Sequence, residues 1–320
     1  MDHITLTLFG PGRWISELGK ETTENIFSVR NLKKEDKILS LVHPSRYPEK
    51  IQSLLYSLYL GSHVILNISK VDRELGELLV AIDLMEKNRG WISVEEESIN
   101  YKLESVLGDN PVNGYERIDS NPALIRDRLL GLDIKRRDTD TLLIVDQAFP
   151  VKGIGCVALG FVHSGIIRKY QELTVLPGGM TTQIRSIQIQ DEEYEDAPAG
   201  SRVGVALKNL DPESIPRGSV LTPNPEKIIV DNIVTVRFRI PSLFDIELKK
   251  GMRFHLQSSL QMVPCEIIDV DDPEDSEGYL FQEMELKTDS PIWMRVDHQL
   301  GLCYLDSRNF RLFGTGVILL

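Results

Sequence analysis

The residues whose spacing comes nearest to a phosphate site follow the first predicted strand, where glycines stand at positions 10 and 12. A phosphate-binding loop has the pattern GxxxxGK[ST], because its glycines let backbone N–H groups face the phosphates, its lysine neutralises their charge and its hydroxyl holds Mg²⁺. Counted from Gly10, the second glycine, the lysine and the hydroxyl are replaced by Ile15, Ser16 and Glu17. The pair Gly19-Lys20 is no substitute, because a glutamate follows it and no GK[ST] occurs in the chain. The pattern therefore predicts that this segment does not bind phosphate.

Metal ligands and nucleophiles also lack the spacing that their chemistry needs. None of the six histidines forms an HxxxH or HxxE pair that could clamp a metal, and no serine lies in a GxSxG elbow. The acidic run 269–278 lacks the glycine and the closing glutamate of a calcium loop, so we expect a solvated hairpin loop. We expect no catalytic residue, no metal and no cofactor.

Composition narrows the class of protein further. The chain of 320 residues has a net charge of −12, and each of the segments 1–139, 140–225 and 226–320 is acidic, so wholesale electrostatic binding of nucleic acid is not supported. Cys156, Cys265 and Cys303 lie far apart without a CxxC pair, which favours buried, reduced thiols in a cytoplasm. No stretch approaches the roughly eighteen apolar residues that a membrane helix needs, and no secretion leader is recognisable at the N-terminus.

Two kinds of hydrophobic periodicity divide the chain. Up to residue 139, strand-like runs at 4–9, 37–42, 63–68 and 91–94 alternate with helical stripes at 51–58, 75–82 and 99–107. Strands separated by helices predict a parallel sheet covered on both faces. The character changes at 134–138, and from Thr141 onward short strands and turns predict β-barrels. A proline-bearing joint at 222–225 separates two such β segments.

The middle of the chain resembles the second domain of elongation factor Tu and its relatives. The similar elements are Val151 to Gly160, Ser164 to Ile167, Arg185 to Gln188, Ala199 to Gly204 and Ile215 to Gly218, in the order of that family. Gly155, Gly165 and Gly200 stand where a tight barrel needs bends or a positive φ. The end of the chain, Arg308 to Ile318, resembles the last hairpin of the family's third domain. Within the family, the chain looks most like the branch of the selenocysteine-specific elongation factor, and in particular its archaeal EF-Pyl-like paralogues.

The resemblance implies a degenerate P-loop GTPase-like α/β domain at 1–138, followed by two elongation factor Tu-type β-barrels at 139–225 and 226–320. The family's DxPG motif, which serves Mg²⁺ and the γ-phosphate, should follow the strand 37–42, where His43-Pro44-Ser45-Arg46 stand. Its guanine-reading NKxD motif should follow the strand 91–94, where Glu95-Glu96-Glu97-Ser98 stand. Three motifs lost together predict a pseudo-GTPase rather than an enzyme.

The resemblance also implies which residues of the first barrel would receive the 3′ end of an aminoacyl-tRNA. Gln188 falls where the family presents a side chain to the terminal base, and Arg202 lies beside the pocket for the aminoacyl group. The first reading of function is a cytoplasmic translation-factor paralogue that binds tRNA, other RNA or the ribosome through its barrels. The alternatives are a regulatory or scaffold protein that docks on translation or tRNA-modifying partners, and a GTPase with unorthodox motifs.

Overall fold

A computed structural model describes residues 2–34, 37–133, 139–244, 246–307 and 310–319. The chain divides into two compact units, one made of residues 1–138 with 198–202 and the other of 139–197 with 203–320. The sequence change at 134–138 and the first two residues of the predicted last hairpin, 308–309, lie outside the described residues. Among the described residues, no helix is both long and apolar enough to cross a membrane.

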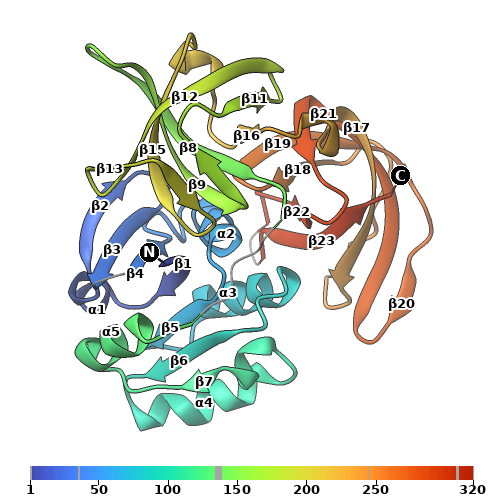
Figure 1. Cartoon of the computed structure of the whole chain (residues 1–320). Coiled ribbons are helices and arrows are strands. Elements are labelled where there is room, and N and C mark those ends of the chain that lie inside the picture. Colours follow the sequence, from blue (N-terminus) through green and yellow to red (C-terminus); the bar gives the residue numbers. More distant parts are fainter. Residues whose placement is uncertain (1, 35–36, 134–138, 245, 308–309, 320) are drawn as a thin grey trace. The chain divides into compact units, whose positions relative to one another are not determined.

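The first unit is an α/β layer structure built on a mixed sheet with the strand order β2-β3-β4-β1-β5-β6-β7 (Figure 1). Its strands are β1 (Asp2–Phe9), β2 (Lys20–Glu24), β3 (Ser28–Lys34), β4 (Lys37–His43), β5 (Val64–Ile68), β6 (Gly90–Val94) and β7 (Glu116–Arg117). Its helices are α1 (Gly12–Glu17), α2 (Ile51–Leu60), α3 (Arg73–Leu84), α4 (Glu97–Leu107) and α5 (Pro122–Leu130), with a single 3₁₀ turn η1 (Pro111–Gly114).

The prediction of a wholly parallel sheet is wrong at one edge. From β4 to β7 neighbouring strands are parallel, but β2 and β3 form an antiparallel hairpin beside β4. Hydrophobic periodicity did not predict this hairpin, because its strands are rich in Lys, Glu, Thr and Asn. Such residues are tolerated at a sheet edge, where one side of the strand faces solvent and charge opposes pairing with other chains.

Helices cover both faces of this sheet, as predicted. On one face, Ile4, Leu6 and Leu8 of β1 pack in a buried cluster with residues of α1 and α5. On the other face, Thr7 of β1 donates a hydrogen bond from Oγ1 to the carbonyl oxygen of Ser57 in α2 at 2.6 Å. Alternate residues of β1 therefore tie the two helical layers to the central strand.

The second unit contains two closed β-barrels, which confirms the predicted fold class. In the first, the order β11-β16-β8-β9-β15-β12 is closed by pairing of β11 with β12 (Figure 1). Its strands are β8 (Leu142–Val151), β9 (Gly155–Ser164), β11 (Glu172–Leu176), β12 (Met180–Ile189), β15 (Arg202–Leu207) and β16 (Val220–Thr222). The short strand β13 (Glu192–Tyr194) extends β12, while β10 (Ile166–Arg168) pairs with β14 (Asp196–Pro198).

The second barrel has the order β17-β23-β22-β18-β19-β21 and is closed by pairing of β17 with β21. Its strands are β17 (Ile229–Pro241), β18 (Arg253–Ser258), β19 (Gln261–Val270), β21 (Tyr279–Met294), β22 (Leu300–Cys303) and β23 (Leu312–Ile318), with β20 (Glu274–Ser276) added to β21. The acidic residues between β19 and β21 are exposed, as expected for a solvated hairpin. In the described part of the two barrels, the helical segments are the single 3₁₀ turns η2 (Pro212–Ser214) and η3 (Pro225–Lys227). The proposed boundaries at 138 and 225 stay predictions.

Two predictions about individual residues in the barrels are confirmed. Gly155 and Gly165 have φ values of 101° and 65°, in the left-handed region where a side chain would be strained. Cys156, Cys265 and Cys303 are all buried and unpaired by disulfides. Burial raises the pKa of the Cys265 thiol to about 12, so this thiol is inert at neutral pH.

Candidate functional site

The carboxyl edge of the parallel strands is where open α/β sheets bind ligands. Here the chain leaves β1 at Phe9, turns at Gly10-Pro11 and enters α1 at Gly12, so the helix begins too early for a loop of phosphate-binding length. Ile15 is part of the buried core, and the Ser16 hydroxyl donates to the carbonyl oxygen of Arg13 at 2.6 Å. The positions that a phosphate site would give to glycine and lysine thus serve the local structure of α1.

The side chain of Trp14 fills the space above the turn that follows β1. It is 6% exposed, and its indole Nε1–H donates to the carbonyl oxygen of Ser120 at 2.9 Å. A Cβ built on Gly10 would lie 2.7 Å from Cε3 of Trp14 and 3.1 Å from Cβ of Asn67. The indole therefore spans from the β1–α1 turn to the connection between β7 and α5, where it excludes other groups.

Asn67 lies beside Gly10, near the carboxyl end of β5. Its side chain is 5% exposed, and neither Oδ1 nor Nδ2 has a hydrogen-bond partner among the described residues. Buried amides normally have partners, so Asn67 is an unusual polar group at this edge. No motif in the sequence marks Trp14 or Asn67, because their proximity depends on the fold.

His43 ends β4 at the position that the resemblance assigns to the Mg²⁺-linked aspartate. Its ring Nδ1 lies 3.1 Å from the carbonyl oxygen of Leu8, so the imidazole bridges β4 and β1. Burial lowers the pKa of His43; the hydrogen bond to Leu8 acts in the opposite direction, and the nearby Arg30 guanidinium lowers it further. A neutral imidazole held in this way fastens two strands and supplies none of the negative charge that Mg²⁺ requires.

The lowered pKa of His43 predicts a pH dependence of stability. Because the folded-state pKa lies below 6.5, the ordinary pKa of histidine, the neutral ring stabilises the fold above about pH 6.5. That contribution is lost as the pH falls through the folded-state pKa. We expect the free energy of unfolding of the wild type to fall more steeply between pH 7.5 and pH 5 than that of His43→Asn, a variant that does not titrate there. Urea unfolding followed by circular dichroism at several pH values measures this difference. Parallel curves for the two proteins would contradict the role of His43.

The residues after β6 present carboxylates where the guanine-reading motif would stand. Glu95 and Glu96 are exposed, and α4 begins at Glu97. The hydroxyl of Ser98 donates to Oε2 of Glu96 at 3.3 Å, which holds one carboxylate at the start of the helix. The segment after β6 offers acceptors and negative charge, but at positions 95–98 it has neither the amide donor nor the lysine stem that read and cover a guanine.

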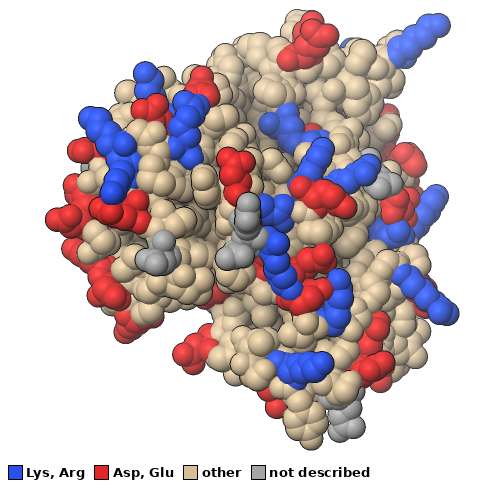
Figure 2. Space-filling view, turned by 180° about the vertical axis from the view of Figure 1, so that it is seen from behind, with Lys and Arg blue, Asp and Glu red and all other residues tan. Residues whose placement is uncertain are grey.

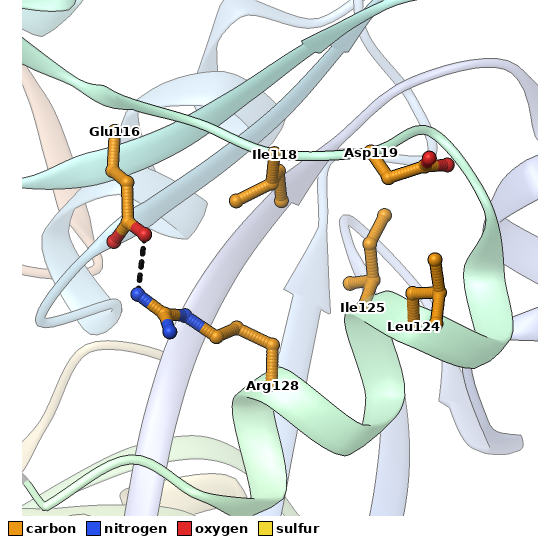
Figure 3. A pocket seen from close by; sticks show the side chains of 6 residues that line it. All are labelled: Glu116, Ile118, Asp119, Leu124, Ile125 and Arg128. Atoms are coloured by element: carbon orange, nitrogen blue, oxygen red, sulfur yellow. Dashed lines mark hydrogen bonds and ion pairs between the residues drawn. The ribbon is translucent and has the colours of Figure 1, made fainter.

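A shallow depression of about 220 Å³ lies between β7 and α5 (Figure 3). Its apolar side is formed by Ile118, Leu124 and Ile125, and its other side by the ion pair of Glu116 and Arg128, as Figure 3 shows. Ligand pockets usually measure roughly 300–1,000 Å³, so this depression is smaller than a typical pocket for a drug-sized or nucleotide-sized ligand.

The two residues predicted to receive an RNA end lie on neighbouring strands of the first barrel. Gln188 is exposed on β12, where it pairs with Gly204 of β15 and with Glu193 of β13. Arg202 begins β15 but is only 9% exposed and has contacts within the protein. Gln188 is therefore presented to solvent beside an acidic hairpin, whereas Arg202 offers little surface.

Positive and negative side chains are interspersed on the face of the molecule drawn in Figure 2. On this face no broad field of Lys and Arg stands out, in agreement with the net charge of −12. Among the described residues there is also no group of three or more His, Cys, Asp and Glu side chains that could hold a metal ion.

Known proteins resemble this chain in sequence and in fold. The family model of elongation factor Tu domain 2 matches residues 155–222. An uncharacterized protein of Methanocaldococcus jannaschii is 29% identical over 99% of both chains. The selenocysteine-specific elongation factor of the same organism is 30% identical over 65% of this chain, which spans only 44% of that factor. Elongation factor 1-alpha of Metallosphaera sedula is 24% identical over 52% of this chain and 41% of that protein.

Solved structures agree with these relatives in fold. The translation elongation factor SelB of Methanococcus maripaludis, in complex with the GTP analogue GppNHp, has a TM-score of 0.83 at 21% identity, covering 99% of this chain and 79% of that one. The bacterial selenocysteine-specific elongation factor EF-Sec has a TM-score of 0.78 at 17% identity, covering 99% of this chain and 58% of that one. These solved structures thus share the fold of this chain, an α/β domain followed by two barrels.

Proposed function

Because this chain is a relative of the elongation factor Tu and SelB translation factors, we propose that it is a translation-factor-like protein that has lost GTP binding. We further propose that it contacts tRNA, other RNA or the ribosome through its two barrels. This makes it a cytoplasmic binding protein rather than an enzyme.

The position of Trp14 is the observation that carries the loss of GTP binding. A nucleotide at the carboxyl edge needs an open loop after β1, and the buried indole, which packs against Gly10 and donates to Ser120, supports the proposal that this turn is closed. The chemistry of the edge agrees, because the groups at the corresponding positions are Ser16, His43 and Glu95. These supply neither the lysine, nor the magnesium ligand, nor the guanine donor of a GTPase site.

The regulatory or scaffold reading rests on a different observation, the acidity of the surface around Gln188. Gln188 is paired directly with Glu193, Glu192 is paired with Ile189, and the turn between the two strands contains Asp191. RNA phosphates would be repelled by these carboxylates, whereas a basic protein partner would be attracted. Binding measurements with tRNA separate the two readings.

If the first barrel receives an RNA end, Gln188→Ala should weaken tRNA binding by roughly 1 kcal/mol, about fivefold, because one side-chain hydrogen bond is lost. Arg202→Ala should in addition reduce the salt slope by roughly one if the guanidinium contacts a phosphate. Filter binding over a range of salt concentrations measures both quantities. Gln183→Ala, at the other end of the same strand, is the matched control and should leave binding unchanged.

The unfolding midpoint of each variant must be measured as well, because Arg202 is buried and its loss can act through folding. If the wild-type protein shows no tRNA binding at low salt, the acceptor-end proposal fails and the scaffold reading replaces it. Affinity purification from native lysate, with identification of RNA and protein together, then names the partner.

A further inference from the structure

Three basic side chains gather at the amino edge of the α/β sheet, opposite its carboxyl edge. His63 directly precedes β5, Arg89 directly precedes β6, and Lys87 stands two residues before Arg89. Figure 1 labels both strands. The first residues of these parallel strands, Val64 and Gly90, are paired, and the Val64 N–H donates to the carbonyl oxygen of Arg89 at 3.2 Å. The two connections therefore lie side by side, although 23 residues of chain separate His63 from Lys87.

Contacts with fixed groups hold two of these side chains in place. The Lys87 ammonium donates to the carbonyl oxygen of Gly61 at 2.9 Å, which places it at the end of α2, two residues before His63. The ring of His63 stacks on Trp91, with centroids 5.5 Å apart and planes inclined by 22°, and its Nδ1 lies 3.2 Å from the Ser62 hydroxyl. The imidazole is thereby oriented before any ligand arrives.

The backbone of the second connection is also tightly positioned. The phenol of Tyr115 donates a hydrogen bond to the carbonyl oxygen of Lys87. A Cβ on Gly90 would lie 2.3 Å from the carbonyl oxygen of Val64 and 2.4 Å from Cε2 of Tyr115, so this position admits glycine alone. The segment that carries Lys87 and Arg89 is thus fixed against its neighbours.

Lys87 and Arg89 bring two positive charges close to the ring of His63. Burial lowers the pKa of His63, and the charges of Arg89 and Lys87 lower it further. Arg89 is exposed, and its guanidinium has no hydrogen bond or ion pair within the described part of the chain. Gathering cations in a chain of net charge −12 opposes stability, and an anion placed among them would remove that cost.

We propose that His63, Lys87 and Arg89 form a binding site for a phosphate group at the amino edge of the α/β sheet. The ammonium, the planar guanidinium and the imidazole offer several N–H donors, which suit the oxygens of a phosphate better than the two oxygens of a carboxylate. The phosphate belongs either to an RNA backbone or to a small phosphorylated molecule. This site lies on the α/β unit, whereas Gln188 belongs to the other unit. The phosphate site can therefore be tested independently of acceptor-end binding.

The test is an NMR titration of the full chain with inorganic phosphate, at ionic strength held constant with chloride. The His63 ring resonance is assigned by its disappearance in His63→Gln. Phosphate should shift this resonance saturably and raise the pKa of His63, because the anion favours the charged ring. Arg89→Gln should weaken phosphate binding about tenfold, while Lys152→Gln, in an exposed turn of the first barrel, should leave it unchanged.

A second titration with a short single-stranded RNA distinguishes the sources of the phosphate. Binding of RNA that is tighter than that of free phosphate and is weakened in Arg89→Gln assigns the site to RNA. Saturable binding of free phosphate alone assigns it to a small phosphorylated molecule. The proposal is overturned if neither ligand shifts His63 saturably, or if Arg89→Gln, which should fold normally since Arg89 is exposed, binds as tightly as the wild type.

Discussion

Isothermal titration of the protein with GTP or GDP in the presence of Mg²⁺ should show no binding with a dissociation constant below about 10 µM, which corresponds to roughly 7 kcal/mol. Three separate parts of the nucleotide lose their partners. The phosphates meet Ile15, Ser16 and Glu17 in place of a glycine, a lysine and a hydroxyl. At the position of the Mg²⁺-linked aspartate stands His43, whose imidazole contacts Leu8. At the position of the guanine-reading motif stands the carboxylate of Glu95.

The expected loss of affinity is large because these deficits act on different contacts. Each lost charged or bidentate contact typically costs about 1–3 kcal/mol. The four losses are the lysine, the hydroxyl, the Mg²⁺-linked aspartate and the guanine-reading motif, and together they amount to roughly 4–12 kcal/mol. A nanomolar site is worth about 12 kcal/mol, and at the upper end of this range it would be weakened beyond millimolar. The indole of Trp14 is expected to add a steric term, because it is buried and packs against Gly10 in the turn that follows β1.

The titration is most informative when it is repeated with ATP. A weak heat signal that is the same for GTP and ATP reports contacts to phosphate alone, since the two differ in the base. A dissociation constant below about 10 µM for GTP, with at least tenfold weaker binding of ATP, would show that a guanine site survives and would favour the reading of an unorthodox GTPase.

The parts of the fold that sequence predicted correctly are those with one dominant hydrophobic pattern. Val64–Ile68 is an apolar run broken only by one asparagine, and all five residues are buried, as a central parallel strand requires. The barrels were recognisable from short strands and turn residues, and the structure confirms the positive φ expected at Gly155 and Gly165. Local pattern and tertiary environment agree at these positions.

Elements whose role depends on long-range contacts were not predictable in the same way. The hairpin of β2 and β3 is too polar to show a hydrophobic face, and α5 has only Ile125 and Leu129 buried along nine residues. The partner of Trp14 is Ser120, 106 residues further along the chain. The absence of phosphate motifs could be read from spacing alone, but the burial of Trp14 against the turn after β1 could not.

The same limit applies to the barrel and to the amino edge. Arg202 was predicted beside a pocket from its place in the motif, yet its burial depends on packing that no local pattern reports. His63, Lys87 and Arg89 carry no motif, and they become a cluster only because β5 and β6 are adjacent in the sheet. The sequence predicts the strand or helix that carries such a residue. The order of the strands in the sheet determines which of these residues lie close together.

Replacing Trp14 with alanine should lower the free energy of unfolding of the α/β unit by about 3–5 kcal/mol, the usual cost of truncating a buried Trp or Phe. The indole packs in the cluster of α1, α5 and β1, so its removal leaves a cavity. The loss also deprives the Ser120 carbonyl of its donor. Urea unfolding followed by far-ultraviolet circular dichroism measures the effect without relying on tryptophan fluorescence.

Two matched variants separate packing from hydrogen bonding in this prediction. Trp14→Phe keeps an aromatic ring but lacks the N–H donor, so the variant should lose less than Trp14→Ala, with about 1–3 kcal/mol coming from the unpaired carbonyl. Tyr101→Ala, which removes a ring that is 77% exposed, should change stability by no more than about 0.5 kcal/mol. A loss below about 1 kcal/mol in Trp14→Ala would contradict the packing of the indole. Because the lysine, the hydroxyl and the guanine readers are still missing, Trp14→Ala should not gain GTP binding, and micromolar binding by this variant would mean that the indole alone closes an otherwise competent site.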